Sequence, residues 1–171
     1  MTIRVGINGF GRIGRNVLRA IIESKRKDIK VVAINNRSSL KVCAHLLKYD
    51  SVHGVFPYEI SASENKINVG DESIYVSHEL TIDGIPWHKN DVDLVMECTG
   101  KFNNADECRK HIDGGAKRVL ISAPAKDADL TVVYGVNEEK INSSHKIISN
   151  ASCTTNCLAP VAKVLNDNFG I

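Results

Sequence analysis

The sequence predicts an α/β protein built on a doubly wound, mostly parallel sheet with a small antiparallel insertion. Three observations carry this prediction. Strand-like and helix-like segments alternate along most of the 171 residues, a glycine-rich turn joins the first strand to the first helix, and small or polar residues follow several predicted strands. A chain of this length can form one domain with a hydrophobic core.

The first fifty residues show the clearest alternation. Residues 3–8 form a short, mostly apolar run that predicts a strand, and residues 11–24 place their apolar side chains on one helical face. A second buried strand is predicted over residues 30–35. Ser39 is positioned to cap a helix that carries apolar residues between positions 40 and 47.

The rest of the chain is first irregular and then alternates again. Residues 54–90 contain short alternating pieces that indicate a small antiparallel insertion. The further strands are predicted at 66–69, 73–76, 91–97, 118–122, 130–134 and 146–149, and the helices at 103–113, near 138–142 and from Ser152 onward.

In a doubly wound sheet, ligands bind beyond the carboxyl ends of the parallel strands. Five residues follow predicted strands and should therefore lie on one rim of the sheet: Gly9, Asn35, Thr99, Ser122 and Cys153.

The segment from Gly9 to Gly14 reads GFGRIG, a GxGxxG motif that opens a helix directly after a strand. In a dinucleotide-binding Rossmann fold, the first glycine forms the tight turn and the second admits a diphosphate. The third lets helix and strand pack closely, and the helix start adds partial positive charge. Glycines in such turns often serve packing alone. The flanking strand, helix and second strand favour dinucleotide binding here, with Gly9, Gly11 and Gly14 as cofactor-binding residues.

The acidic residue that normally binds the adenosine ribose is missing. Asn36 stands there, followed by Arg37. An asparagine does not repel a 2′-phosphate and an arginine can attract one, so NADP would be tolerated alongside NAD. A plain Asn-Arg loop without any cofactor contact is the alternative, and both interpretations stay open.

Cys153 follows a predicted strand and falls in the first turn of the last helix, with Ser152 as N-cap. The helix dipole and unpaired amides at that position favour a thiolate. A thiolate can add to an aldehyde to form a thiohemiacetal, and hydride transfer from that adduct to a nicotinamide leaves a thioester. The hydroxyls of Ser152 and Thr154 suit a phosphate or oxyanion. A structural thiol is the alternative for Cys153, and for Cys157 a structural role is preferred.

The composition and the distribution of apolar residues argue against several classes of protein. The net charge of +2 gives no nucleic-acid footprint, and no apolar run approaches the roughly 20 residues of a membrane span. No signal-peptide core is present, so the cytoplasm is expected. Five cysteines without framework spacing argue against a disulfide scaffold, and Cys153 and Cys157 have no second ligand pair, so no metal site is predicted.

Several segments together resemble phosphorylating glyceraldehyde-3-phosphate dehydrogenase over the whole chain. They are residues 6–15 (GINGFGRIGR), 45–54 (HLLKYDSVHG), 97–100 (ECTG), 122–124 (SAP), 134–137 (YGVN) and 149–156 (SNASCTTN). Erythrose-4-phosphate dehydrogenase shares nearly all of these motifs and is the alternative.

The resemblance implies a role for each matching residue. Arg12 and Ile13 would line the pyrophosphate, and Thr99 and Ser122 would lie along the cofactor near its nicotinamide half. Cys153 would be the catalytic nucleophile, with Ser152 and Thr154 at the substrate or inorganic phosphate position. Two positions depart from the family: Asn36 replaces the acidic ribose ligand, and Leu80 replaces the arginine found seven residues before Trp87.

The resemblance also implies two domains: residues 1–150 as an NAD(P)-binding Rossmann domain, and residues 151–171 as the start of a catalytic domain whose remainder is absent. That remainder would supply a histidine base and most of a homotetramer interface. The expected activity is NAD-dependent oxidative phosphorylation of glyceraldehyde 3-phosphate, a glycolytic reaction, with this N-terminal portion inactive alone. Two other hypotheses are a dinucleotide-binding module without turnover and a protein that senses oxidants through a reactive thiol.

Overall fold

The computed structural model describes residues 2–171 and is organised around one mixed sheet. Among these residues the sheet has nine strands in the order β10-β11-β9-β8-β1-β2-β7-β6-β5, parallel from β10 to β7 and antiparallel from β7 to β5. The strands are β1 (Ile3–Asn8), β2 (Ile29–Asn35), β5 (Ile60–Ser63), β6 (Lys66–Val69), β7 (Glu72–Ser77), β8 (Leu94–Glu97), β9 (Arg118–Ile121), β10 (Leu130–Thr131) and β11 (Ile147–Ser149).

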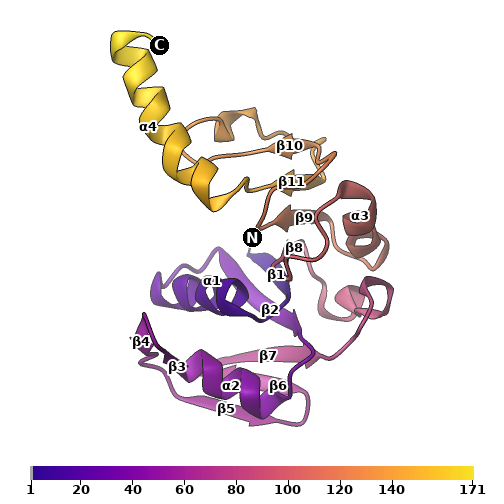
Figure 1. Cartoon of the computed structure of the whole chain (residues 1–171). Coiled ribbons are helices and arrows are strands. Elements are labelled where there is room, and N and C mark those ends of the chain that lie inside the picture. Colours follow the sequence, from indigo (N-terminus) through magenta and orange to yellow (C-terminus); the bar gives the residue numbers. More distant parts are fainter. Residues whose placement is uncertain (1) are drawn as a thin grey trace.

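Helices cover both faces of this sheet (Figure 1). On one side lie α1 (Arg12–Glu23) and α2 (Leu40–Lys48), and on the other lies α3 (Ala105–Asp113). Short 3₁₀ helices span Ile82–Gly84, Trp87–Asn90 and Glu138–Lys140, and β3 (Tyr49–Asp50) and β4 (Gly54–Val55) form a separate hairpin. The prediction of an α/β doubly wound sheet is confirmed.

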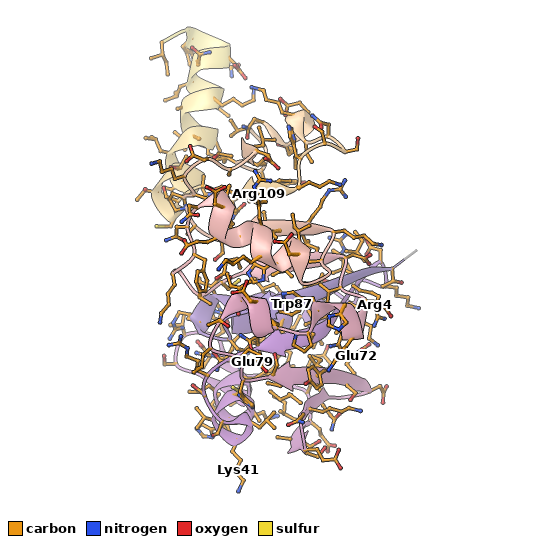
Figure 2. All side chains as sticks on the ribbon, turned by 90° about the vertical axis from the view of Figure 1, so that its right-hand side faces the viewer. Arg4, Lys41, Glu72, Glu79, Trp87 and Arg109 are labelled. Carbon is orange, nitrogen blue, oxygen red and sulfur yellow. The ribbon has the colours of Figure 1, made fainter. Side chains whose placement is uncertain are left out.

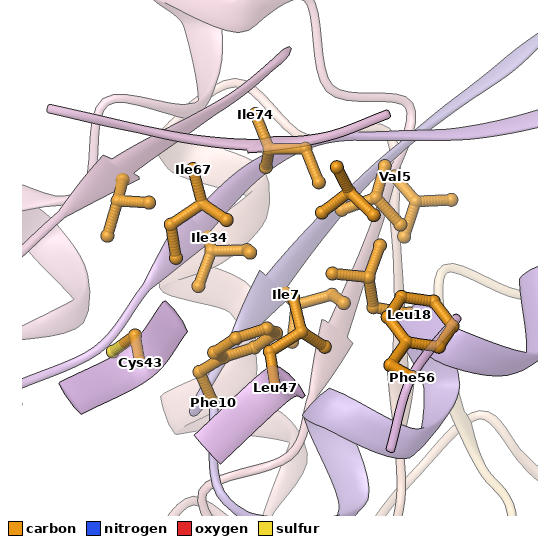
Figure 3. Packing of buried hydrophobic residues seen from close by; sticks show 13 residues of the cluster. Val5, Ile7, Phe10, Leu18, Ile34, Cys43, Leu47, Phe56, Ile67 and Ile74 are labelled. Carbon is orange, nitrogen blue, oxygen red and sulfur yellow. The ribbon is translucent and has the colours of Figure 1, made fainter. Parts of the chain in front are cut away.

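The hydrophobic core is divided by the sheet. Beneath α1 and α2, Ile7, Leu18, Ile34 and Leu47 are at most 1% exposed and pack together (Figure 3). On the opposite face Trp87 is the largest buried side chain and packs in a second cluster. Since burying one such side chain contributes roughly 1.5–3 kcal/mol, the two clusters fix the sheet between its helices.

The antiparallel insertion is integrated more closely than the sequence suggested. Its strands β5, β6 and β7 continue the main sheet, because β7 pairs in parallel with β2. Two predicted strands are shorter than expected. The one over 91–97 begins only at Leu94, since Asp91 has a left-handed backbone (φ 46°). The one over 130–134 ends at Thr131, because the Val133 amide donates to the Asn137 side chain instead of to a strand.

Two helix predictions also change. The segment near 138–142 is a 3₁₀ turn over Glu138–Lys140, and Ser39 stands at the N-cap of α2 without a side-chain capping hydrogen bond in the described structure. The last helix, α4 (Cys153–Phe169), starts as predicted and extends away from the sheet (Figure 1). None of its residues is buried, and several of its apolar side chains are more than half exposed: Leu158, Val161, Val164 and Phe169. Within residues 2–171, no helix combines the length and apolar character needed to span a bilayer.

Candidate functional site: a groove at the strand ends and a thiol on the same rim

A groove of about 230 Å³ lies beyond the carboxyl ends of β1, β2 and β8, at the place where the strand order predicts a ligand. Glycines, amides and two cations from three strand ends meet there. Its lining residues are Asn8, Gly9, Gly11, Asn35, Asn36, Arg37, Glu79, Leu80, Thr81, Ile82, Ile85, Cys98, Thr99, Lys101 and Phe102.

The three glycines of the loop have different reasons to be glycine. Gly9 has φ +93°, and a Cβ there would lie 2.7 Å from the Thr99 nitrogen. At Gly14 a Cβ would lie 2.2 Å from the Gly9 oxygen. Both positions are therefore closed to side chains by the protein itself. Around Gly11 no described atom lies within 4 Å of a Cβ. The fold does not require glycine at this position, but an approaching ligand would.

The first turn of α1 offers free amides beside this loop. Gly11 is the N-cap, and the Arg15 amide makes the first helical hydrogen bond, to the Gly11 oxygen. The amides of Arg12, Ile13 and Gly14 precede that bond, and no side chain of the described residues caps this helix. Such a helix start binds phosphate groups. The cradle therefore fits a diphosphate.

The side chain of Arg12 turns out of the groove. Its guanidinium pairs with Asp50 at 3.1 Å, so Arg12 can serve the cradle through its amide. Backbone amides of His53 and Val52, with Arg12 beside them, lower the pKa of Asp50 to about 2. The half-exposed side chain of Ile13 also does not line the groove.

Asn36 and Arg37 both line the groove, at the end of β2. The Asn36 side chain accepts a hydrogen bond from the Phe10 amide (3.2 Å) and donates to the Cys43 sulfur (3.2 Å), which ties it to the glycine loop. The Arg37 guanidinium donates to the Leu80 carbonyl (3.2 Å). Glu79 is the one acidic side chain among the lining residues, and it comes from the loop after β7.

Thr99 and Ser122 follow the neighbouring strands β8 and β9. Thr99 lines the groove, and both its amide (2.8 Å) and its hydroxyl donate to the Glu97 carboxylate. Ser122 donates its amide to the Glu97 carbonyl (3.0 Å) and lies next to the groove rather than in its lining.

Further along the rim, a tight loop delivers Cys153 from β11 to the start of α4. Ala151 takes a left-handed backbone (φ 57°), and the Ser152 hydroxyl accepts a hydrogen bond from the Thr155 amide (2.9 Å), as predicted for an N-cap. The Asn156 side chain donates to the carbonyls of Asn150 (2.7 Å) and Ser152 (2.9 Å). These bonds hold Cys153 at the first helical position, next to amides that the helix leaves free.

The cysteines differ in their exposure to solvent. Cys153 and Cys157 are exposed, so the preferred structural role for Cys157 does not rest on burial. Burial raises the pKa of Cys98 to about 11 and that of Cys108 to about 12, which disfavours their thiolates. Cys153 is thus the exposed thiol that also begins a helix.

Cys153 and the glycine loop face the same rim but do not touch. Three strand-to-strand steps separate β1 from β11, which is roughly 14 Å at the usual ladder spacing of about 4.8 Å. Only an extended ligand lying along the rim can reach both.

Comparison with known proteins decides the family. The family described as "Glyceraldehyde 3-phosphate dehydrogenase, NAD binding domain" matches residues 3–105, and "Glyceraldehyde 3-phosphate dehydrogenase, C-terminal domain" matches residues 152–171. The chain belongs to the glyceraldehyde-3-phosphate dehydrogenase family. It is 57% identical to "Glyceraldehyde-3-phosphate dehydrogenase" of Xanthobacter flavus and 54% identical to that of Cereibacter sphaeroides. Each match covers 100% of this chain and 51% of the relative, so the chain spans about half the length of these relatives.

Membership of the glyceraldehyde-3-phosphate dehydrogenase family makes NAD the cofactor of this domain. The open space at Gly11 and the free amides of α1 agree with that cofactor. Several residues that line the groove were not predicted from the sequence, notably Asn8, Lys101 and Phe102. Asn8 was detectable, because a polar residue ends a mostly apolar strand. Lys101 and Phe102 lie in a loop whose path the local sequence does not determine.

Proposed function

We propose that the whole protein catalyses the NAD-dependent oxidative phosphorylation of glyceraldehyde 3-phosphate to 1,3-bisphosphoglycerate, and that this chain supplies the cofactor groove and the nucleophile. One observation carries the proposal: Cys153 is exposed at the start of α4, on the sheet rim that also holds the glycine loop. The cofactor-binding residues are Gly9, Gly11, Arg12, Ile13, Gly14, Asn36, Thr99 and Ser122.

The chemistry begins at the Cys153 sulfur. The thiolate adds to the aldehyde carbon, and the amides at the start of α4 stabilise the resulting oxyanion of the thiohemiacetal. Bound NAD supplies the hydride acceptor for its oxidation to a thioester. Inorganic phosphate then attacks the thioester carbonyl, the carbon–sulfur bond breaks, and the Cys153 thiolate is released. The hydroxyls of Ser152 and Thr154, which lie 2.9 Å apart, bind the substrate or inorganic phosphate.

We propose that residues 1–150 form a cofactor domain and that residues 151–171 begin a catalytic domain. The exposed apolar side chains of α4 would pack against the rest of that second domain. A base for the thiol would come from there, so we expect the chain alone to bind NAD without turnover. The whole protein would act in the cytoplasm as a homotetramer, on small molecules.

The activity is tested by following NADH formation from glyceraldehyde 3-phosphate, NAD and phosphate. We expect no turnover with this chain alone, and turnover when the chain is fused to the second half of the Xanthobacter flavus relative. Cys153→Ser in the fusion should abolish turnover, while Cys157→Ser should retain it. Turnover by the chain alone would contradict the expectation that this chain binds NAD without catalysing the reaction. A higher kcat/KM for erythrose 4-phosphate would favour the four-carbon alternative.

We also propose that the groove tolerates NADP. The supporting observation is that Asn36 and Arg37 line the groove where a carboxylate would repel a 2′-phosphate. Calorimetry with each cofactor on the isolated chain gives the two Kd values. A preference for NAD greater than about a hundredfold, which corresponds to about 2.8 kcal/mol, would refute this proposal.

A further inference from the structure

A buried chain of polar side chains runs beneath the groove and extends to the far side of the sheet. Glu97 ends β8 and is 1% exposed, and His111 on α3 and Trp87 are equally sealed, at 0% and 1%. The Trp87 indole donates to His111 Nδ1 (3.0 Å), and His111 Nε2 lies 3.0 Å from Glu97 Oε2. Figure 2 looks onto this face and shows Trp87 next to α3, on which Arg109 is labelled.

This chain of contacts fixes the tautomer of the histidine. An indole nitrogen can only donate, so His111 Nδ1 must accept and carries no proton. The proton of the neutral ring is then on Nε2 and is donated to Glu97. Two aromatic side chains outside the groove thus present one N–H to a carboxylate under its floor.

The same carboxylate holds the groove wall. Glu97 Oε2 also accepts from the Asn8 side chain (2.6 Å), while Oε1 accepts from the amide (2.8 Å) and the hydroxyl of Thr99. Asn8 in turn accepts from Asn35 (2.9 Å). Asn8, Asn35 and Thr99 all line the groove, so Glu97 joins the ends of three adjacent strands.

We propose that His111 is a positioning residue for the cofactor: its Nε2 proton orients the Glu97 carboxylate, which in turn holds Thr99 and Asn8 in place at the groove. This inference rests on the cofactor groove assigned under the proposed function. Among residues 2–171 no lysine or arginine pairs with Glu97, so its carboxylate depends on neutral donors. A buried carboxylate is costly unless its hydrogen bonds are kept, and the loss of one donor lets the group rotate or draw in water.

A pair of substitutions at His111 separates positioning from packing. His111→Asn places a polar atom near the Nδ1 position and keeps an acceptor for Trp87, but it no longer reaches Glu97. His111→Gln places its amide near the Nε2 position and keeps the donor to Glu97. Both remove the buried ring, so both should lower the free energy of unfolding in denaturant titrations.

The decisive readout is the Kd for NAD, measured by calorimetry on the folded chain. We expect His111→Asn to raise it about tenfold, equivalent to about 1.4 kcal/mol, and His111→Gln to stay within about twofold. His88→Gln, at an exposed histidine, is the matched control and should leave the Kd unchanged. Equal Kd values for the Asn and Gln variants would show that His111 only fills space, and would overturn the inference.

The unmodified chain provides a second test that does not depend on the variants folding. Nitrogen NMR of the His111 ring should show the Nε2–H tautomer, and the Thr99 amide should exchange slowly with solvent because Glu97 holds it. An Nδ1–H tautomer, or a rapidly exchanging Thr99 amide, would overturn the inference. If the unmodified chain fails to bind NAD at all, the groove assignment itself is wrong, which is a separate failure.

Discussion

Replacing Gly11 by alanine tests the cofactor groove with little disturbance of the fold. A Cβ at Gly11 meets no described atom within 4 Å, and the backbone there (φ −75°, ψ −160°) is open to alanine. The new methyl group would instead stand at the start of α1, beside the free amides of Arg12 and Ile13. A diphosphate would then have to move away from those amides.

For Gly11→Ala, the expected change in the free energy of unfolding is smaller than the expected change in the free energy of NAD binding. Alanine is a poorer N-cap than glycine by about 0.5–1 kcal/mol. Alanine also lowers the conformational entropy of the unfolded chain, which stabilises the folded state by about 0.4–1 kcal/mol. Because these two effects oppose each other, the free energy of unfolding should change by less than about 1 kcal/mol. Losing one charge-assisted bond from an amide to phosphate costs about 1.5–3 kcal/mol, which raises the Kd for NAD roughly 10- to 150-fold.

Gly14→Ala is the matched control. Its Cβ would lie 2.2 Å from the Gly9 oxygen and 3.0 Å from Ile7, so the helix and strand must separate. We expect the free energy of unfolding to fall by at least about 2 kcal/mol. Denaturant titration and calorimetry on both variants should thus show Gly11→Ala stable but weak in binding, and Gly14→Ala unstable.

Two results would refute this reasoning. If Gly11→Ala bound NAD as tightly as the parent chain, the diphosphate would not approach at Gly11. If Gly11→Ala were destabilised as strongly as Gly14→Ala, Gly11 would be as closely packed in the folded protein as Gly14.

Three further predictions concern reactivity, specificity and pH. Iodoacetamide should label Cys153 faster than free cysteine at neutral pH. The fast phase of labelling should remain in Cys157→Ser and disappear in Cys153→Ser. A fast phase that disappears only in Cys157→Ser would contradict the activation of Cys153 by the helix start. Asn36→Asp should raise the Kd for NADP at least about tenfold relative to that for NAD, since the carboxylate would repel the 2′-phosphate; an unchanged ratio in calorimetry places that phosphate elsewhere. The folded pKa of Asp50 is about 2, below its ordinary 3.8, so its contribution to stability is full above about pH 4 and is lost as pH falls toward 2. Acid titration of Asp50→Asn should therefore show a shallower loss of stability across this window than the parent, and parallel curves would refute the assignment.

The parts of the fold that followed from the sequence are those governed by local pattern. The apolar run of β1, the helical face of α1 and the run of β2 each fix their own geometry, and their observed bounds lie within one residue of the prediction. The sheet edges did not follow so well. β7 joins β2 in parallel through contacts between distant segments, and a short alternating piece does not reveal its partner.

Some features of the candidate site could likewise be predicted from the sequence, and others could not. Gly9 and Gly14 were detectable because their backbone demands leave a spaced motif in the sequence, and Ser152 because a cap precedes a helix. The contact of His111 with Trp87 and Glu97 was not detectable. It depends on α3 packing over β9, which brings His111 to Glu97 at the end of β8, and a histidine on a helical face carries no mark of its partner.

The two ends of the rim are held by different forces, and this bears on how the protein can work. The glycine loop is fixed by close packing, since Gly9 and Gly14 leave no room for a single extra carbon. Cys153, by contrast, is placed by hydrogen bonds of Ser152 and Asn156 on a helix that buries none of its residues. Close packing resists displacement more strongly than a few exposed hydrogen bonds. The cofactor end of the rim is therefore preorganised in this chain, whereas the thiol stands on an exposed helix and is held less firmly.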